Sequence, residues 1–360
     1  MKGDRVARRS MAWAAAAALS LLVSGSGCLQ PARRALPADE EERFRATALE
    51  VLKKAAFSEE PAIRMHAIEA LQEVAPREGL ECISANIENG YGGVSFAALM
   101  ALGTMRRGEF IEQIRIRAED ADPNVVIAAL FALHRLGDQK RTGELSEYLL
   151  NNRDFHIRAN AALVLGRLEE PSMVKLLRIA LQQEKKISPK LQILEALAMY
   201  ENRNAIERLM AYSYDPRPDV ATTALNFLAN ANSEKAEDVF LYRLRSADFP
   251  EIKLEAARGL GRLGRDDGMD LALAHLRFNA PDKNRPNDAP QQQVARIRGL
   301  AALALEAIGS PQALGPLKDA LSAPEQPEDV RLAVARAAVR IIDQRGGRSP
   351  RRPADAEKRK

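Results

Sequence analysis

A unit of about 32 residues recurs along most of this 360-residue chain, and it limits the fold more than any other feature. In each unit an apolar residue is followed by others four, eight and eleven positions later, as in Val125, Ala129, Leu133 and Leu136. That spacing places all four on one face of a helix. The units start at positions 63, 94, 125, 157, 189, 220, 252, 297 and 330, so the starts lie 31 to 33 residues apart except for one interval of 45. A period of this length predicts stacked copies of one supersecondary structure.

A second helix follows the first in each unit. The turns between the two carry Gly, which can end a helix, or Pro, which suits the first turn of the next, as in "GD" at 137–138 and "GSPQ" at 309–312. Acidic residues precede several first helices and are expected to cap them: Asp122, Asp154, Asp215 and Asp248. We therefore predict an all-α fold, an α-solenoid (superhelix) of about nine helical hairpins. Helices about 8–10 Å apart would make it a curved rod roughly 70–90 Å long.

The unit resembles HEAT repeats, specifically the short HEAT-like kind that also occurs in phycobilisome lyases. The resemblance rests on an Asp-Pro-type start, an apolar residue often followed by Arg, paired Ala, Leu-Gly and a Gly-Asp turn, and it covers residues 59–344. The basic position is filled by Arg64, Arg158, Arg298 and Arg331, with Lys253 in its place once. We interpret this row as an Asp–Arg ladder between neighbouring repeats; a row that binds a ligand is the alternative.

The repeats define the organisation of the chain. We assign residues 42–344 to the solenoid, with a cap helix at 42–57 and a last unit that has only its first helix. A polar insert at 279–292 lengthens the connection between the seventh and eighth repeats, either as a solvated spacer or as a loop that contacts a partner. The basic tail at 345–360 contains Pro and Gly and is predicted to be disordered. It would serve as a solubilising end or contact anionic headgroups.

The N-terminus has the composition of an export signal. Basic "MKGDRVARRS" is followed by the apolar run "MAWAAAAALSLLV" and then by "SGSGC", which predicts a signal peptide over residues 1–27. The segment resembles a bacterial lipoprotein signal peptide, in which a cysteine after small residues is lipidated and becomes the mature N-terminus. Ser26 and Gly27 fit this pattern, whereas Gly25 stands where Leu is usual.

That resemblance implies a lipid on Cys28, a tether over 28–41 and a membrane-anchored protein of the bacterial cell envelope. Ordinary cleavage after Ser26 is the alternative, and it would give a soluble periplasmic or secreted protein.

The charge distribution does not favour nucleic acid as a partner. The chain has a net charge of +4, of which residues 1–27 contribute +3 and residues 345–360 contribute +5, so the body between them carries −4. A nucleic-acid-binding body would need a basic surface.

The sequence shows no arrangement of residues that indicates catalysis. The histidines are not at equivalent places in the repeats, and none is followed by Glu as in the His-Glu pairs of deoxyhypusine hydroxylases, a HEAT family that holds two irons; they are His66, His134, His156 and His275. Cys82 is the only cysteine besides Cys28, and we expect it to be buried and inert. We therefore predict no metal, no cofactor and no enzymatic activity.

The predicted function is that of a membrane-tethered scaffold that binds one or more unidentified proteins along its concave face. We expect the second helices to line that face, and the phase of these helices predicts the following contacts: Arg115, Tyr148, Arg178, Arg208, Tyr212, Tyr242 and Arg243. The alternative is an enzyme, or an enzyme accessory of the HEAT-like lyase type, whose site spans several repeats. The sequence leaves the oligomeric state open.

Overall fold

The computed structural model describes residues 33–282 and 288–348, and every regular element in these ranges is a helix. The first helix of each unit is an α-helix: α2 (Pro61–Val74), α4 (Gly92–Thr104), α6 (Pro123–Arg135), α8 (Phe155–Gly166), α10 (Ile187–Met199), α12 (Pro218–Ala231), α14 (Pro250–Arg262), α16 (Pro290–Ile308) and α18 (Glu328–Arg345). The second helices are α3 (Leu80–Ser84), α5 (Ile111–Arg117), α7 (Glu144–Asn151), α9 (Met173–Gln183), α11 (Arg203–Tyr212), α13 (Glu237–Ser246), α15 (Met269–His275) and α17 (Leu314–Ser322). One helix precedes them all, α1 (Ala38–Ala55).

Two of the four predicted N-caps are confirmed. The Asp122 carboxylate accepts a hydrogen bond from the Asn124 backbone N–H at 2.9 Å, and Asp154 does the same for His156 at 2.8 Å. Asp215 instead accepts from the Arg217 backbone N–H, just before α12 begins. Asp248 is not a cap either, because α14 starts at Pro250 after Phe249.

Neighbouring first helices pack closely because small residues lie where they touch. A Cβ atom added to Gly103 of α4 would lie 2.7 Å from the Ala132 Cα atom of α6. A Cβ on Gly166 of α8 would lie 2.7 Å from the Ala196 Cβ atom of α10. The Leu-Gly step of the repeat therefore provides a close helix-to-helix approach.

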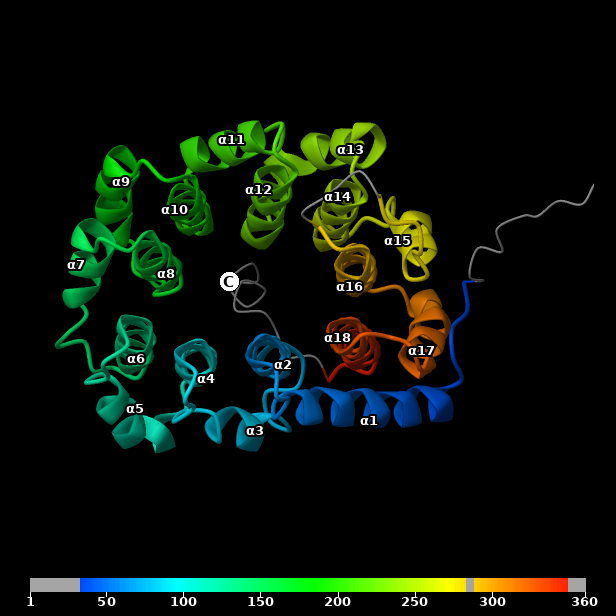
Figure 1. The fold of residues 1–360 in the computed structure, drawn as a ribbon, viewed down its shortest axis with the longest axis horizontal. Coiled ribbons are helices and arrows are strands. Elements are labelled where there is room, and N and C mark those ends of the chain that lie inside the picture. The colour runs from blue at the N-terminus through cyan, green and yellow to red at the C-terminus, as the bar shows by residue number, and fades with distance from the viewer. Residues whose placement is uncertain (1–32, 283–287, 349–360) are drawn as a thin grey trace, which may run out of the picture. The chain divides into compact units, whose positions relative to one another are not determined.

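The described residues fall within one compact unit, and within it the solenoid closes on itself (Figure 1). The first helices form an inner layer, α2 to α18 in even numbers, and the second helices form an outer layer around them. Helix α18 at the end of the chain packs against both α1 and α2 at its beginning. The expected curved rod is therefore wrong, because the rotation between successive repeats accumulates until the two ends meet.

Helix α1 completes the last repeat. It lies in the outer layer against α18, which has no second helix after it in the described chain (Figure 1). Arg45 of α1 donates to both carboxylate oxygens of Asp343 on α18, at 2.6 and 2.8 Å; Asp343 is buried and Arg45 is partly buried. Phe44 and Leu52 of α1 are buried as well. The predicted cap helix thus serves as the missing partner of the final unit.

The segment before α1 is also fixed to the last repeats. The Arg34 backbone N–H donates to the Gln312 carbonyl at 2.9 Å, and the Gly315 N–H donates to the Arg34 carbonyl at 3.0 Å. A Cβ on Gly315 would lie 2.9 Å from that carbonyl oxygen, so glycine permits this contact. The repeat body therefore includes residues 33–41, which corrects the prediction that they belong to the tether.

The prediction of disorder is wrong for the first residues of the basic tail, 345–348. Helix α18 continues to Arg345, whose side chain pairs with Glu41, and Arg348 pairs with Glu42 at 2.8 Å. These pairs join the start of the tail to α1. The rest of the tail, residues 349–360, lies outside the described residues, as do the signal segment and Cys28.

The insert is partly helical. Helix α16 begins at Pro290, and its buried Gln293 accepts from the Asp282 N–H at 3.0 Å and donates to the Asp288 carbonyl at 2.8 Å. This side chain therefore ties together the two described ends of the segment that we predicted as a loop over 279–292.

Candidate protein-binding surfaces

The second helices line the outer surface of the ring, which corrects the prediction that they line its concave face (Figure 1). The inner layer of a ring has the shorter circumference, so its helices must lie closer together. The first helices form this layer because their small residues let them pack closely. The sequence of α6 indicates this inner position, because the helix is apolar on nearly all sides. In the structure it is buried from Val125 to His134. All seven predicted contacts therefore lie on outer helices, Arg115 on α5, Tyr148 on α7, Arg178 on α9, Arg208 and Tyr212 on α11, and Tyr242 and Arg243 on α13.

Two of the seven meet a residue that the sequence analysis missed. Tyr214, in the turn after α11, lies with its ring centroid 5.8 Å from that of Tyr242. The Arg243 guanidinium carbon is 5.3 Å from the Tyr214 centroid. Both tyrosines are exposed, at 47% for Tyr214 and 55% for Tyr242. We call these three residues the Tyr–Arg platform; helix phase could not reveal it, because Tyr214 lies in a turn.

The other predicted contacts do not gather into one site. Arg115 pairs with Glu112 at 2.7 Å and with Asp138 at 3.2 Å. Tyr148 and Tyr212 are partly buried against the core, and burial together with the charge of Glu144 raises the pKa of Tyr148. Arg178 and Arg208 form no ion pair with described residues.

Apolar side chains also remain exposed on the outer helices. Ile116 of α5 is 66% exposed and Ile179 of α9 is 38% exposed. Single exposed apolar residues are ordinary. Because they lie in the same outer layer as the Tyr–Arg platform, however, they add to the surface that a partner could cover.

The inner layer carries a charged network where the ring closes. Glu73 of α2 accepts from Arg336 at 2.8 Å and from Arg340 at 3.3 Å, and both arginines also donate to Glu306 of α16. Burial raises the pKa of Glu73, but the charges of Arg336 and Arg340 outweigh it and lower that pKa overall. The sequence signal was available, because Glu73 and Arg340 are both ten residues after the first residue of their repeats.

A second polar network spans α10, α12 and α14. Buried Glu195 accepts from Asn230 at 2.8 Å and from Gln192. On α12, Asn226 lies next to Asn230 and donates to Glu255 of α14 at 3.4 Å. Burial raises the pKa of Glu195. Several repeats together thus hold the Glu195 carboxyl group away from solvent on the inner face.

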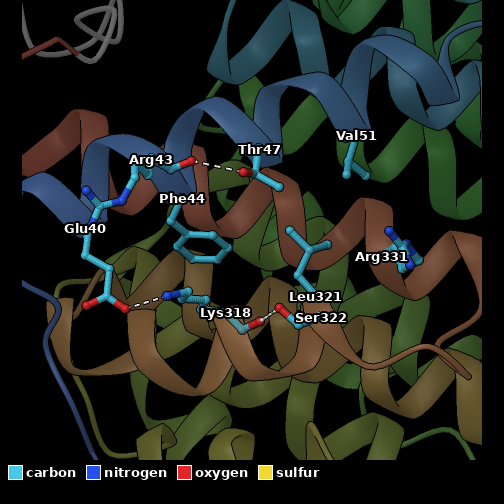
Figure 2. A pocket seen from close by; sticks show the side chains of 9 residues that line it. All are labelled: Glu40, Arg43, Phe44, Thr47, Val51, Lys318, Leu321, Ser322 and Arg331. Carbon is cyan, nitrogen blue, oxygen red and sulfur yellow. Dashed lines mark hydrogen bonds and ion pairs between the residues drawn. The ribbon is translucent and has the colours of Figure 1, made fainter.

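A groove of about 300 Å³ marks the outer seam of the ring, between α1 and α17 (Figure 2). Phe44 and Val51 of α1 and Leu321 of α17 give it an apolar lining. At one end Lys318 donates to Glu40 across the seam, and this hydrogen bond lowers the pKa of Glu40. The groove exists only because the two ends of the solenoid meet.

The comparisons with known proteins agree with the repeat geometry. HEAT repeats match residues 111–198. The chain is an α-solenoid, and this central part of it matches HEAT repeats. No curated protein sequence matches it.

Three solved structures similar to this HEAT-like solenoid are human deoxyhypusine hydroxylase in complex with glycerol, the CpcE–CpcF complex of phycocyanin lyase from Nostoc, and YibA from Escherichia coli. Their identities are 18%, 16% and 16%, and their TM-scores are 0.34, 0.38 and 0.34. The matches cover 85%, 70% and 71% of this chain and 97%, 93% and 91% of the others.

The basic position that recurs in the repeats does not form the predicted Asp–Arg ladder. Arg158 instead pairs with Glu184 at 2.7 Å, and Arg298 donates to the Gln326 side chain at 2.6 Å. Arg64 stacks on the Tyr91 ring at 5.3 Å. In each case the partner lies 26 to 28 residues later, just before the next first helix. The row therefore links neighbouring repeats, as expected, but through several kinds of partner.

Within residues 33–282 and 288–348, no three His, Cys, Asp or Glu side chains are placed to hold a metal ion. In the same ranges no helix is both long and apolar enough to cross a membrane. Cys82 is buried, and burial raises the pKa of its thiol.

Proposed function

We propose that this protein is an exported, membrane-anchored scaffold that binds other proteins through the outer surface of its ring and does not catalyse a reaction. The observation that carries the proposal is the Tyr–Arg platform. Tyrosine and arginine are among the residues that dominate binding energy at protein interfaces. The ring form supports the same proposal, because closure leaves the whole outer layer facing outward (Figure 1).

The anchor would be a lipid on Cys28. Four residues separate Cys28 from Arg33, where the described body begins. A chain of that length reaches at most about 17 Å. If Cys28 is lipidated, the ring is held directly against the membrane surface and cannot move far from it.

Fractionation of cells tests the anchor. We expect the wild-type chain in the membrane fraction and a Cys28→Ala variant in the soluble fraction or as an unprocessed precursor. A Cys28→Ala protein that is processed normally and stays on the membrane would show that the lipoprotein proposal is wrong.

Affinity capture tests the scaffold. The tagged full chain, cross-linked in intact cells and purified from membranes, should bring down the same protein partner in repeated experiments. A ring variant without the platform, Tyr242→Ser, should recover less of that partner. Absence of any partner from the wild-type sample would contradict the proposed function.

The second candidate is an enzyme or enzyme accessory whose site spans several repeats, and the Glu195 network is the observation that favours it. A Glu195→Gln variant keeps the shape of the side chain but removes its ionisation. Under the scaffold proposal this variant captures the same partner as the wild type. A change in a product or modification of that partner, with capture unaltered, would favour the enzyme.

A further inference from the structure

The Tyr–Arg platform contains a positive charge that the protein itself does not neutralise. The Arg243 side chain forms no ion pair or hydrogen bond with the described residues, and its Nε atom is buried without a hydrogen-bond partner. The guanidinium lies over the ring of Tyr214, and a guanidinium stacked in this way can still donate from its edge.

The neighbouring arginines show what such a group binds when a carboxylate is near. Arg217 donates to both carboxylate oxygens of Asp215, two residues before it in the chain, at 2.9 Å. Arg265 likewise donates to both oxygens of Asp267, at 2.7 and 3.1 Å. Both of these arginines pair with an aspartate two residues away, whereas the Arg243 side chain pairs with no described carboxylate.

We propose that the platform binds an acidic segment of a partner protein, with a carboxylate of that segment taken by Arg243 and an adjoining side chain packed on the rings of Tyr214 and Tyr242. This rests on the proposed scaffold function and adds the chemistry of the partner. Charge complementarity selects the occupant, because a carboxylate supplies the two acceptors that match a guanidinium. The two rings supply exposed apolar area beside it, as binding hot spots do.

A second stacked pair on the molecule provides a control. Arg64 lies 5.3 Å from the centroid of Tyr91, which is 56% exposed, so the chemistry of one ring and one guanidinium is repeated there. That pair has no second tyrosine stacked on it within the described residues. If binding of the acidic segment requires two neighbouring tyrosine rings, the variant Tyr91→Ser should bind that segment as the wild type does.

The first test uses a fluorescein-labelled synthetic peptide with four glutamates around one leucine, titrated with the full chain and followed by fluorescence anisotropy. Arg243→Gln and Tyr242→Ser should each weaken binding at least about tenfold. Tyr91→Ser should leave it unchanged, and a peptide with glutamine in place of glutamate should bind at least about tenfold less well to the wild type. Equal binding of the two peptides, or an equal loss in Tyr91→Ser, would overturn the proposal.

The second test separates this inference from the scaffold function. A photo-crosslinking amino acid is placed in cells at position 242, or at position 116 on another outer helix, and the attached peptides are identified by mass spectrometry. An adduct at 242 whose attached segment is rich in Asp and Glu, and which Arg243→Gln removes, supports the inference. Adducts at 116 alone would overturn the platform while the scaffold stands, and no adduct at either position would count against both.

Discussion

At the scale of single residues, closure of the ring depends on positions that admit no side chain. Gly315 touches the backbone of Arg34, whereas Gly299, on the long helix α16, has open space where a Cβ would lie. Substitution by Ala should therefore have opposite effects on stability at the two positions, although both lie in helices, Gly299 in α16 and Gly315 in α17.

Replacing Gly315 with Ala should destabilise the protein by about 1–3 kcal/mol, because the new Cβ would overlap the Arg34 carbonyl, which cannot move without breaking its hydrogen bond. Gly299→Ala should stabilise it by about 0.5–1 kcal/mol through helix propensity. Urea unfolding measures both. A Gly315→Ala protein as stable as the wild type would show that the segment before α1 is not firmly docked.

The buried carboxyl of Glu195 has a raised pKa, so the folded protein holds its proton more tightly than the unfolded chain. Its contribution to stability is complete below the ordinary pKa of 4.5 and is lost as the pH rises through the folded value. The stability of Glu195→Gln relative to wild type should therefore increase as the pH rises from about 4 to 8.

The pKa of Glu184 is shifted in the opposite direction, below its ordinary value. Burial raises its pKa, but hydrogen bonds from Arg158 and from the backbone N–H of Lys186 lower it overall. Glu184→Gln should therefore lose stability relative to wild type as the pH rises. Urea unfolding at several pH values measures both variants, and parallel curves for the two would contradict the assigned environments.

At the scale of secondary-structure elements, α1 is the helix whose role could not be predicted. Its sequence indicates an amphipathic helix, and a cap was the natural interpretation of its place before the first repeat. Its partners, however, are Asp343 and the rest of α18, about 300 residues away in the chain. A sequence pattern shows which face of a helix is apolar but not which distant helix covers it.

Two arginines of α1 test that role. Arg45 pairs with Asp343 in a buried setting, with 11% and 4% of the side chains exposed, so Arg45→Ala should cost about 3–5 kcal/mol by leaving the Asp343 carboxylate unpaired. Arg43 pairs with Asp39 in solvent, and Arg43→Ala should cost less than about 0.5 kcal/mol. Thermal or urea unfolding compares them, and similar losses would mean that α1 does not pack on α18 as described.

At the scale of the whole molecule, the repeat was predictable and the ring was not. The 4-4-3 spacing identified every first helix because it recurs nine times. Closure depends on small rotations that add up over all repeats, and no single repeat reveals their sum. The same limit placed the candidate contacts on the wrong side: the helices carrying Tyr242 and Arg243 were identified, but the direction of curvature was not, and Tyr214 in its turn had no periodic signal.

Closure of the ring is the central claim, and a distance across its seam tests it most directly. Thr47 of α1 and Ser322 of α17 are exposed and line the same groove (Figure 2). Nitroxide labels on cysteines at these two positions, in a chain that carries Cys28→Ala and Cys82→Ser, would be measured by double electron–electron resonance. A closed ring predicts a single distribution below about 30 Å, from two packed helices and two label arms. A distribution centred at about 60 Å or more, the separation expected for the ends of an open stack of nine repeats, would contradict it.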